Sequence, residues 1–95
     1  MGKTYYPSDI FLDRDYPLKI GIINKGKTSR IYAVRSFCNQ LMVEEINNIL
    51  VRPNETSERL LYMRSYWEGK QKWIFKLYES DNEINQLYIS VNCER

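Results

Sequence analysis

The sequence predicts an α+β domain, an antiparallel sheet with one helix packed on it. Apolar residues alternate at strand spacing near residues 18–37, change to helical spacing over residues 40–51, and alternate again in three stretches after residue 58. These observations give the order ββαβββ, ending in a three-stranded meander. With 95 residues, 43% of them hydrophobic, we expect residues 1–95 to form a single domain with one core.

The first two strands are expected to form a hairpin. Residues 1–16 mix aromatic and aspartate side chains without a sustained period, so they predict an irregular N-terminal arm. Leu18, Ile20 and Ile22 then alternate with polar or small residues, which is typical of a strand. Residues 24–27 (NKGK) have turn chemistry, and residues 29–37 are rich in β-branched and aromatic side chains that favour a second strand.

A helix is predicted from Gln40 to Val51. Its apolar stripe would consist of Met42, Val43, Ile46, Ile49 and Leu50. Glutamate and asparagine residues take the opposite side, as on an amphipathic helix that lies on a sheet. Asn39 is a suitable N-cap, and the Arg52-Pro53 pair is a suitable stop.

The meander is predicted from residues 59–67, 71–79 and 84–93. The first stretch fits a helical face as well as a strand, but its aromatic density and the Glu68-Gly69 turn favour the strand. The other two stretches alternate clearly and would be joined by residues 80–83. Their inward side chains form the expected sheet core: Trp73, Phe75, Leu77, Leu87, Ile89, Val91 and Cys93.

The outward phase of the meander is the candidate binding surface. It combines aromatic rings with cations: Tyr62, Arg64, Tyr66, Lys72, Lys76, Tyr78 and Tyr88. Such surfaces bind other proteins, or bind single-stranded nucleic acids by base stacking and phosphate contacts. Nearby carboxylates at residues 68, 79, 81 and 83 favour a protein partner, since phosphates avoid them. A third interpretation is that another part of the chain covers these rings.

Catalytic and metal-binding groups are scarce. The sequence has no histidine, which excludes histidine-dependent catalysis and metal sites. Glu44 and Glu45 would diverge on a helix, and Asp9, Asp13 and Asp15 lack the glycine and glutamate of a calcium loop. We therefore expect no enzymatic activity, no cofactor and no metal.

One phosphate-loop pattern needs explanation. Residues 21–28 (GIINKGKT) match the arrangement G-x-x-x-x-G-K-T. A phosphate loop opens a helix, whereas residues 29–37 favour a strand, so nucleotide binding is a minor alternative that a helix over residues 27–37 would support. Cys38 and Cys93 are expected to be small buried thiols, with a disulfide as the alternative.

Residues 16–22 (YPLKIGI) resemble a short Pro-Leu-Lys-Ile-Gly-Ile segment of the FinO/ProQ family of RNA chaperones. The resemblance implies a largely helical, more basic chain around the segment. Residues 24–37 and 71–93 have neither property, so no functional residue is carried over from that family.

These features together predict a small non-enzymatic binding protein. No apolar run approaches the roughly 20 residues that cross a bilayer, and the first residues lack a secretory signal, so we expect a cytoplasmic protein without a membrane partner. An inhibitor or adaptor that engages a partner protein fits best, of a kind that phages and mobile elements encode. Single-stranded nucleic-acid binding is the alternative, and a homodimer through the meander edge is a variant.

Overall fold

The protein is an all-β sandwich. The computed structural model describes residues 9–95, and these form seven strands and no helix. The strands are β1 (Asp9–Phe11), β2 (Tyr16–Ile23), β3 (Arg30–Cys38), β4 (Leu41–Val51), β5 (Thr56–Met63), β6 (Gly69–Glu79) and β7 (Asn82–Glu94). The predicted α+β class is therefore wrong. Within this part of the chain there is also no helix long and apolar enough to cross a membrane.

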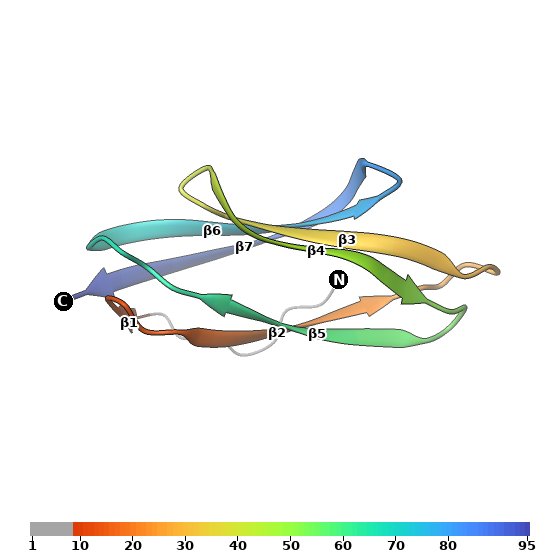
Figure 1. The fold of residues 1–95 in the computed structure, drawn as a ribbon, viewed down its shortest axis with the longest axis horizontal. Coiled ribbons are helices and arrows are strands. Elements are labelled where there is room, and N and C mark those ends of the chain that lie inside the picture. Colours follow the sequence, from red (N-terminus) through yellow and green to blue (C-terminus); the bar gives the residue numbers. More distant parts are fainter. Residues whose placement is uncertain (1–8) are drawn as a thin grey trace.

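Two sheets face each other (Figure 1). The larger has the strand order β1-β7-β6-β3-β4, and β2 with β5 forms the smaller. The short strand β1 runs parallel to β7, whereas every other pair is antiparallel. Of the expected N-terminal arm, residues 9–11 thus form a sheet strand, and residues 1–8 lie outside the described residues.

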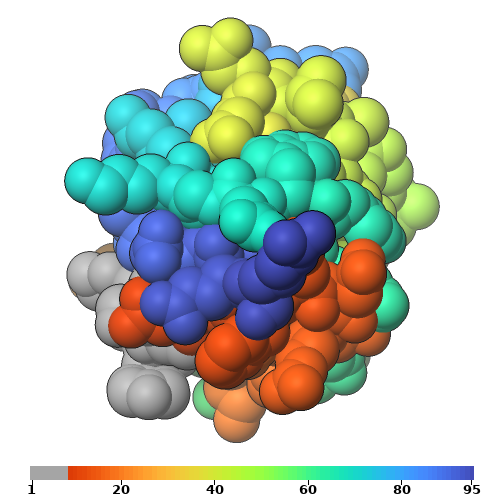
Figure 2. All heavy atoms as spheres, turned by 90° about the vertical axis from the view of Figure 1, so that its left-hand side faces the viewer, coloured from red at the N-terminus to blue at the C-terminus, as the bar shows by residue number. Residues whose placement is uncertain are grey.

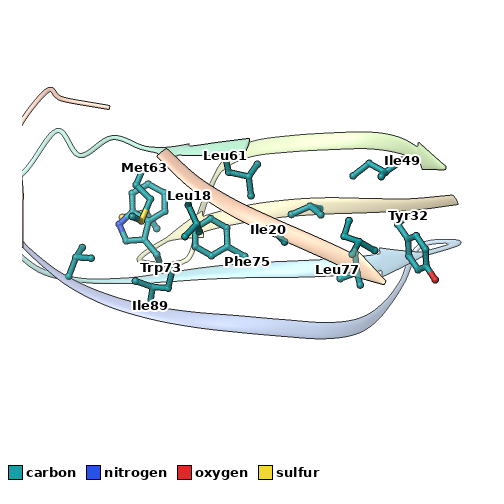
Figure 3. Packing of buried hydrophobic residues seen from close by; sticks show 14 of the residues in the cluster. Leu18, Ile20, Tyr32, Ile49, Leu61, Met63, Trp73, Phe75, Leu77 and Ile89 are labelled. Carbon is teal, nitrogen blue, oxygen red and sulfur yellow. The ribbon is translucent and has the colours of Figure 1, made fainter. Parts of the chain in front are cut away.

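The core lies between the two sheets (Figure 3). Trp73 and Phe75 of β6 are fully buried, with their rings stacked at a centroid distance of 6.2 Å. The smaller sheet contributes buried Leu18, Leu61 and Met63. Each such side chain stabilises the fold by about 1.5–3 kcal/mol through removal from water. The predicted inward phase of residues 73–93 is confirmed, with Leu87 only partly buried.

The predicted helix is strand β4, and two β-bulges explain the error. Val34 pairs with Ile46 and Tyr32 with Ile49, so the register shifts by one residue between these pairs. A second shift lies between Ser36 and Phe37. Because each bulge adds one residue to β4, side chains three positions apart point to the same core. The bulges therefore imitate helical spacing at Ile46 and Ile49, whereas Met42, Val43 and Leu50 of the predicted stripe are exposed.

The predicted hairpin over residues 18–37 is also wrong. Strand β2 pairs with β5, and β3 pairs with β4 and β6, so the two segments lie in opposite layers (Figure 1). The three-stranded meander fails for the same reason, since β5 belongs to the smaller sheet. Only its last hairpin, β6–β7, is confirmed. Residues 59–63 are a strand, as favoured, and residues 64–67 lie in the connection to β6.

Candidate functional site

The candidate site is the face of the larger sheet that points away from β2 and β5, which we call the outer face. Strands β3, β4, β6 and β7 supply its side chains: Ala33, Arg35, Phe37, Met42, Glu45, Lys72, Ile74, Lys76, Tyr78, Gln86, Tyr88 and Ser90. The turns at residues 39–40 and 80–81 rise on this side near opposite ends (Figure 1). The outer face is therefore a saddle between two raised turns.

These turns follow from their residue types. Asn39 and Gln40 have φ angles of 47° and 74°, and Ser80 and Asp81 have φ angles of 50° and 64°. Two consecutive residues with positive φ make the tight turn that matches the twist of an antiparallel hairpin, and Asn and Asp adopt it most readily after glycine. Asn39, expected to cap a helix, instead begins a hairpin turn.

Strand register arranges the outer face in bands that cross the strands. Met42, Phe37, Ile74 and Tyr88 are successive partners on β4, β3, β6 and β7, and we call them the apolar band. The next partners along the same strands, the charged band, are Glu45, Arg35, Lys76 and Gln86. Partners that are directly opposite lie about 4.5–5.5 Å apart, so each band is continuous.

Cations of the outer face stack on its rings. The Arg35 guanidinium carbon lies 4.4 Å from the Tyr78 ring centroid, and Lys72 Nζ lies 4.5 Å from that of Tyr88. Lys76 Nζ lies 5.3 Å from the Phe37 centroid. At exposed positions such contacts contribute about 0.5–1 kcal/mol each. The rings and cations are therefore held together before any partner binds.

Two of these cations also have carboxylate partners. Arg35 Nε lies 2.6 Å from Glu45 Oε2, and Lys76 Nζ lies 3.1 Å from Glu83 Oε1. The hydrogen bond to Glu45 raises the pKa of Arg35, and that to Glu83 raises the pKa of Lys76. Hydrogen bonds from Asn47 and Arg35 lower the pKa of Glu45. The charged band is thus largely neutralised within the sheet.

A hollow lies on the other side of the apolar band. It has a volume of about 540 Å³ and is lined by Asn39, Lys70, Gln71, Lys72, Ser90, Val91 and Asn92. The Asn39 side-chain oxygen accepts a hydrogen bond from the Lys72 backbone N–H at 3.0 Å, which fixes the β3–β4 turn beside β6. Within residues 9–95, no carboxylate forms a salt bridge with Lys70 or Lys72. The hollow is therefore cationic.

The seven predicted site residues fall into two groups. Lys72, Lys76, Tyr78 and Tyr88 share the outer face. The other three, Tyr62, Arg64 and Tyr66, line a crevice of about 230 Å³ with Asp15, Val43, Glu44 and Trp73. The prediction of one continuous face is wrong, because β5 lies in the smaller sheet.

The crevice lies between the β5–β6 connection and the start of β4. These two segments (teal and yellow-green) lie next to each other in Figure 2. Arg64 Nη1 lies 3.3 Å from Asp15 Oδ1, and its Nη2 donates a 2.8 Å hydrogen bond to the Asp13 carbonyl. Burial raises the pKa of Glu44, and a backbone hydrogen bond from Tyr62 opposes that shift. Arg64 thus orders the connection.

Sequence reasoning did not assign Arg35, Phe37 and Met42 to the outer face. Met42 was assigned to the false helix, and the partners of β3 were unknown. One signal was available, because Arg35 shares its strand phase with Ile31 and Ala33 and so requires a solvent-facing side of β3.

The phosphate-loop pattern is a connection between the two sheets. Asn24 is buried, its Nδ2 donates to the carbonyls of Thr28 and Val51, and its Oδ1 accepts from the Gly26 N–H. A phosphate loop must leave its backbone N–H groups free for the ligand, whereas that of Gly26 is already satisfied. Residues 30–38 form strand β3, so the helix that nucleotide binding required is absent there.

The comparison with solved structures identifies the architecture. The crystal structure of the CARDB domain of the PF1109 protein from Pyrococcus furiosus, in complex with di-metal ions, matches with a TM-score of 0.79 at 13% identity, covering 95% of this chain and 83% of that one. The solution structure of the same domain gives 0.77 at 14% identity, covering 94% and 88%. The fold is CARDB-like. No family model matches the sequence, and neither does any curated protein.

Because the sequence identity to the CARDB domain is only 13–14%, the similarity shows the fold of this chain and nothing further. The di-metal ions belong to the PF1109 domain. In the described part of this chain, no group of three or more Cys, Asp or Glu residues is placed to hold a metal ion. Both cysteines are buried free thiols, which answers the open question of their pairing.

Proposed function

We propose that this protein is a small non-enzymatic binding protein, an inhibitor or adaptor, that engages another protein through its outer face. The observation that carries the proposal is the banded arrangement: an apolar band with exposed ends lies beside a charged band of paired residues. Met42 is 56% exposed and Tyr88 is 46% exposed. Aromatic side chains, Met and Arg are enriched where proteins bind proteins.

Charge pairing favours a protein over a nucleic acid as the partner. Nucleic-acid affinity depends on cations that replace counterions at phosphates, and on ring faces on which bases stack. Here Arg35 and Lys76 already have carboxylates, and the rings of Tyr78 and Tyr88 already carry cations. A partner with mixed charges meets this surface without breaking those contacts.

The test compares two double variants of equal composition change. Tyr78→Ala with Tyr88→Ala alters the outer face, and Tyr62→Ala with Tyr66→Ala alters the crevice as a matched control. Each folded protein, checked by circular dichroism, is immobilised and used to capture partners from a lysate of the source organism after nuclease treatment. The expected result is a partner retained by wild type and control, but reduced at least about tenfold on the outer-face variant, which corresponds to about 1.4 kcal/mol.

Identical capture by wild type and outer-face variant would contradict the proposal. Without nuclease, binding of mixed single-stranded DNA or RNA that falls steeply between about 50 and 200 mM salt would support the nucleic-acid alternative instead.

A further inference from the structure

The direction of the apolar band restricts the kind of partner element that fits it. The band crosses four strands at right angles, from Met42 on β4 to Tyr88 on β7. Neighbouring strands are about 4.8 Å apart, so the band is roughly 15 Å long. An α-helix rises 1.5 Å per residue, so about ten residues cover this length. An added strand would run along a sheet edge instead, parallel to the strands.

The saddle shape matches a helix in the same orientation. The turns at residues 39–40 and 80–81 rise near opposite ends of the strands, one on each side of the band (Figure 1). A rod that lies across the strands therefore fits between them. Phe37 and Ile74 are half-buried at the middle of the band, and its ends, Met42 and Tyr88, are exposed. Such a stripe accepts residues at positions i, i+3, i+4 and i+7 of a helix.

The two flanks of the band differ in charge. Arg35 and Lys76 on one flank are paired with Glu45 and Glu83. On the other flank is the hollow, where Lys70 and Lys72 have no carboxylate partner within the described residues, and Ser90 and Asn92 add hydrogen-bonding groups. Charge complementarity requires acidic side chains at the hollow.

Edge pairing with a second copy fits the structure less well. β4 is an edge strand of the larger sheet, but its two register shifts and the positive φ of Asn48, 57°, interrupt the regular row of backbone groups that an added strand needs. Bulges of this kind are a known protection of sheet edges.

We infer that the partner contributes an amphipathic α-helix, whose apolar stripe lies on the apolar band and whose acidic flank enters the hollow at Lys70 and Lys72. This inference rests on the proposed function and specifies its partner. The helix crosses β4, β3, β6 and β7 between the two raised turns. Acidic residues on the opposite flank of the helix would face Arg35 and Lys76, which already pair with Glu45 and Glu83. The helix therefore needs acidic residues on one flank only.

The probes are stapled helical peptides of about 14 residues, long enough for three to four turns. One has leucines at stripe spacing and glutamates along one flank, and its matched control has lysines in place of the glutamates. A third peptide has the glutamate sequence with two central prolines and no staple, so it cannot form the helix. Binding is measured by fluorescence anisotropy and mapped by amide chemical shifts.

We expect the glutamate helix to bind at least about tenfold more tightly than the lysine helix, a difference of about 1.4 kcal/mol. Its shifts should centre on Phe37, Lys72, Ile74 and Tyr88. Lys72→Glu should remove the preference for glutamate, whereas Lys27→Glu, an equal charge change in the exposed β2–β3 loop, should leave it unchanged.

Equal binding of the glutamate and lysine helices, equal binding of the proline peptide, or shifts centred on Tyr62 and Tyr66 would overturn the inference. So would the absence of binding at millimolar peptide. If the helices fail while captured partner still depends on Tyr78 and Tyr88, the helix inference falls and the proposed function stands. If capture does not depend on these tyrosines, the proposed function itself falls.

Discussion

Asn24→Ala should destabilise the protein strongly, although the residue lies in a loop between sheets. The side chain donates hydrogen bonds of 2.8 Å to the Thr28 carbonyl and 2.9 Å to the Val51 carbonyl, and accepts one of 2.9 Å from the Gly26 N–H. Its backbone also bonds to Glu55 and Asn54 at 3.2 and 2.7 Å, so the β2–β3 and β4–β5 connections meet at this residue.

The magnitude follows from these bonds. Each contributes about 1 kcal/mol net, and a buried acceptor left without a donor costs about 1–3 kcal/mol more. Val51 is buried, so leaving its carbonyl without a hydrogen-bond donor costs the most free energy. We expect the free energy of unfolding to fall by roughly 3 kcal/mol, a large part of the 5–15 kcal/mol that is ordinary for a domain.

The assay is urea unfolding at 25 °C, followed by tryptophan fluorescence, since Trp73 is fully buried. The slope of the free energy against urea should stay constant while the midpoint falls. Lys27→Ala is the matched control in the same loop, because Lys27 is exposed, and its effect should stay within about 0.5 kcal/mol.

A loss below about 1 kcal/mol for Asn24→Ala would refute this account of the buried bonds. If the wild type bound ATP or GTP and the stable Lys27→Ala protein did not, residues 21–28 would be a phosphate loop. That result would also contradict this account of the loop.

Three further predictions concern side chains that the fold removes partly or fully from water. Gln71→Leu should lower stability by roughly 2–3 kcal/mol, because Gln71 Nε2 donates to Ser65 Oγ and the Trp67 carbonyl and Oε1 accepts from Trp73 Nε1; unchanged thermal unfolding would contradict this. Burial raises the pKa of Glu44 above its ordinary 4.5, so the folded state binds the proton more tightly, and stability should fall as pH rises from that value through the raised pKa. Glu44→Gln should flatten this fall in urea titrations between about pH 4 and 7, and an identical slope would exclude the effect. Burial raises the pKa of the Cys38 thiol to about 11, so at pH 8 it should react with a disulfide reagent far more slowly in the folded than in the unfolded state; equal rates would show that it is accessible.

The strand phase of the second half of the chain could be predicted from the sequence. Trp73, Phe75 and Leu77 are buried and their neighbours are not, because one side of β6 faces the core and the side-chain period of a strand is two. The same rule failed for β4, where two bulges shift the phase and Ile46 and Ile49 turn toward the same core. A bulge depends on the partner strand, so a single strand's sequence does not reveal it.

The pairing of the strands was the second feature that could not be predicted from the sequence. Alternation shows which side of a strand is buried but not which strand lies next to it, and β2 pairs with β5 across 32 intervening residues, from Ile23 to Thr56. Sequence reasoning therefore located only part of the candidate site. Lys72, Lys76, Tyr78 and Tyr88 lie on one confirmed hairpin, whereas Arg35 and Phe37 joined them only when the β3–β6 register was known.

The pairing of β2 with β5 has a consequence for the order of folding. The β3–β4 and β6–β7 hairpins close through two-residue turns, so they cost little loop entropy and are expected to form early. The smaller sheet must close around the whole β3–β4 hairpin, which makes it a late event. An early intermediate would then have a formed outer face, while Trp73 and Phe75 would not yet be covered by β2 and β5. A partner that binds the outer face would then find its site complete before the smaller sheet has closed.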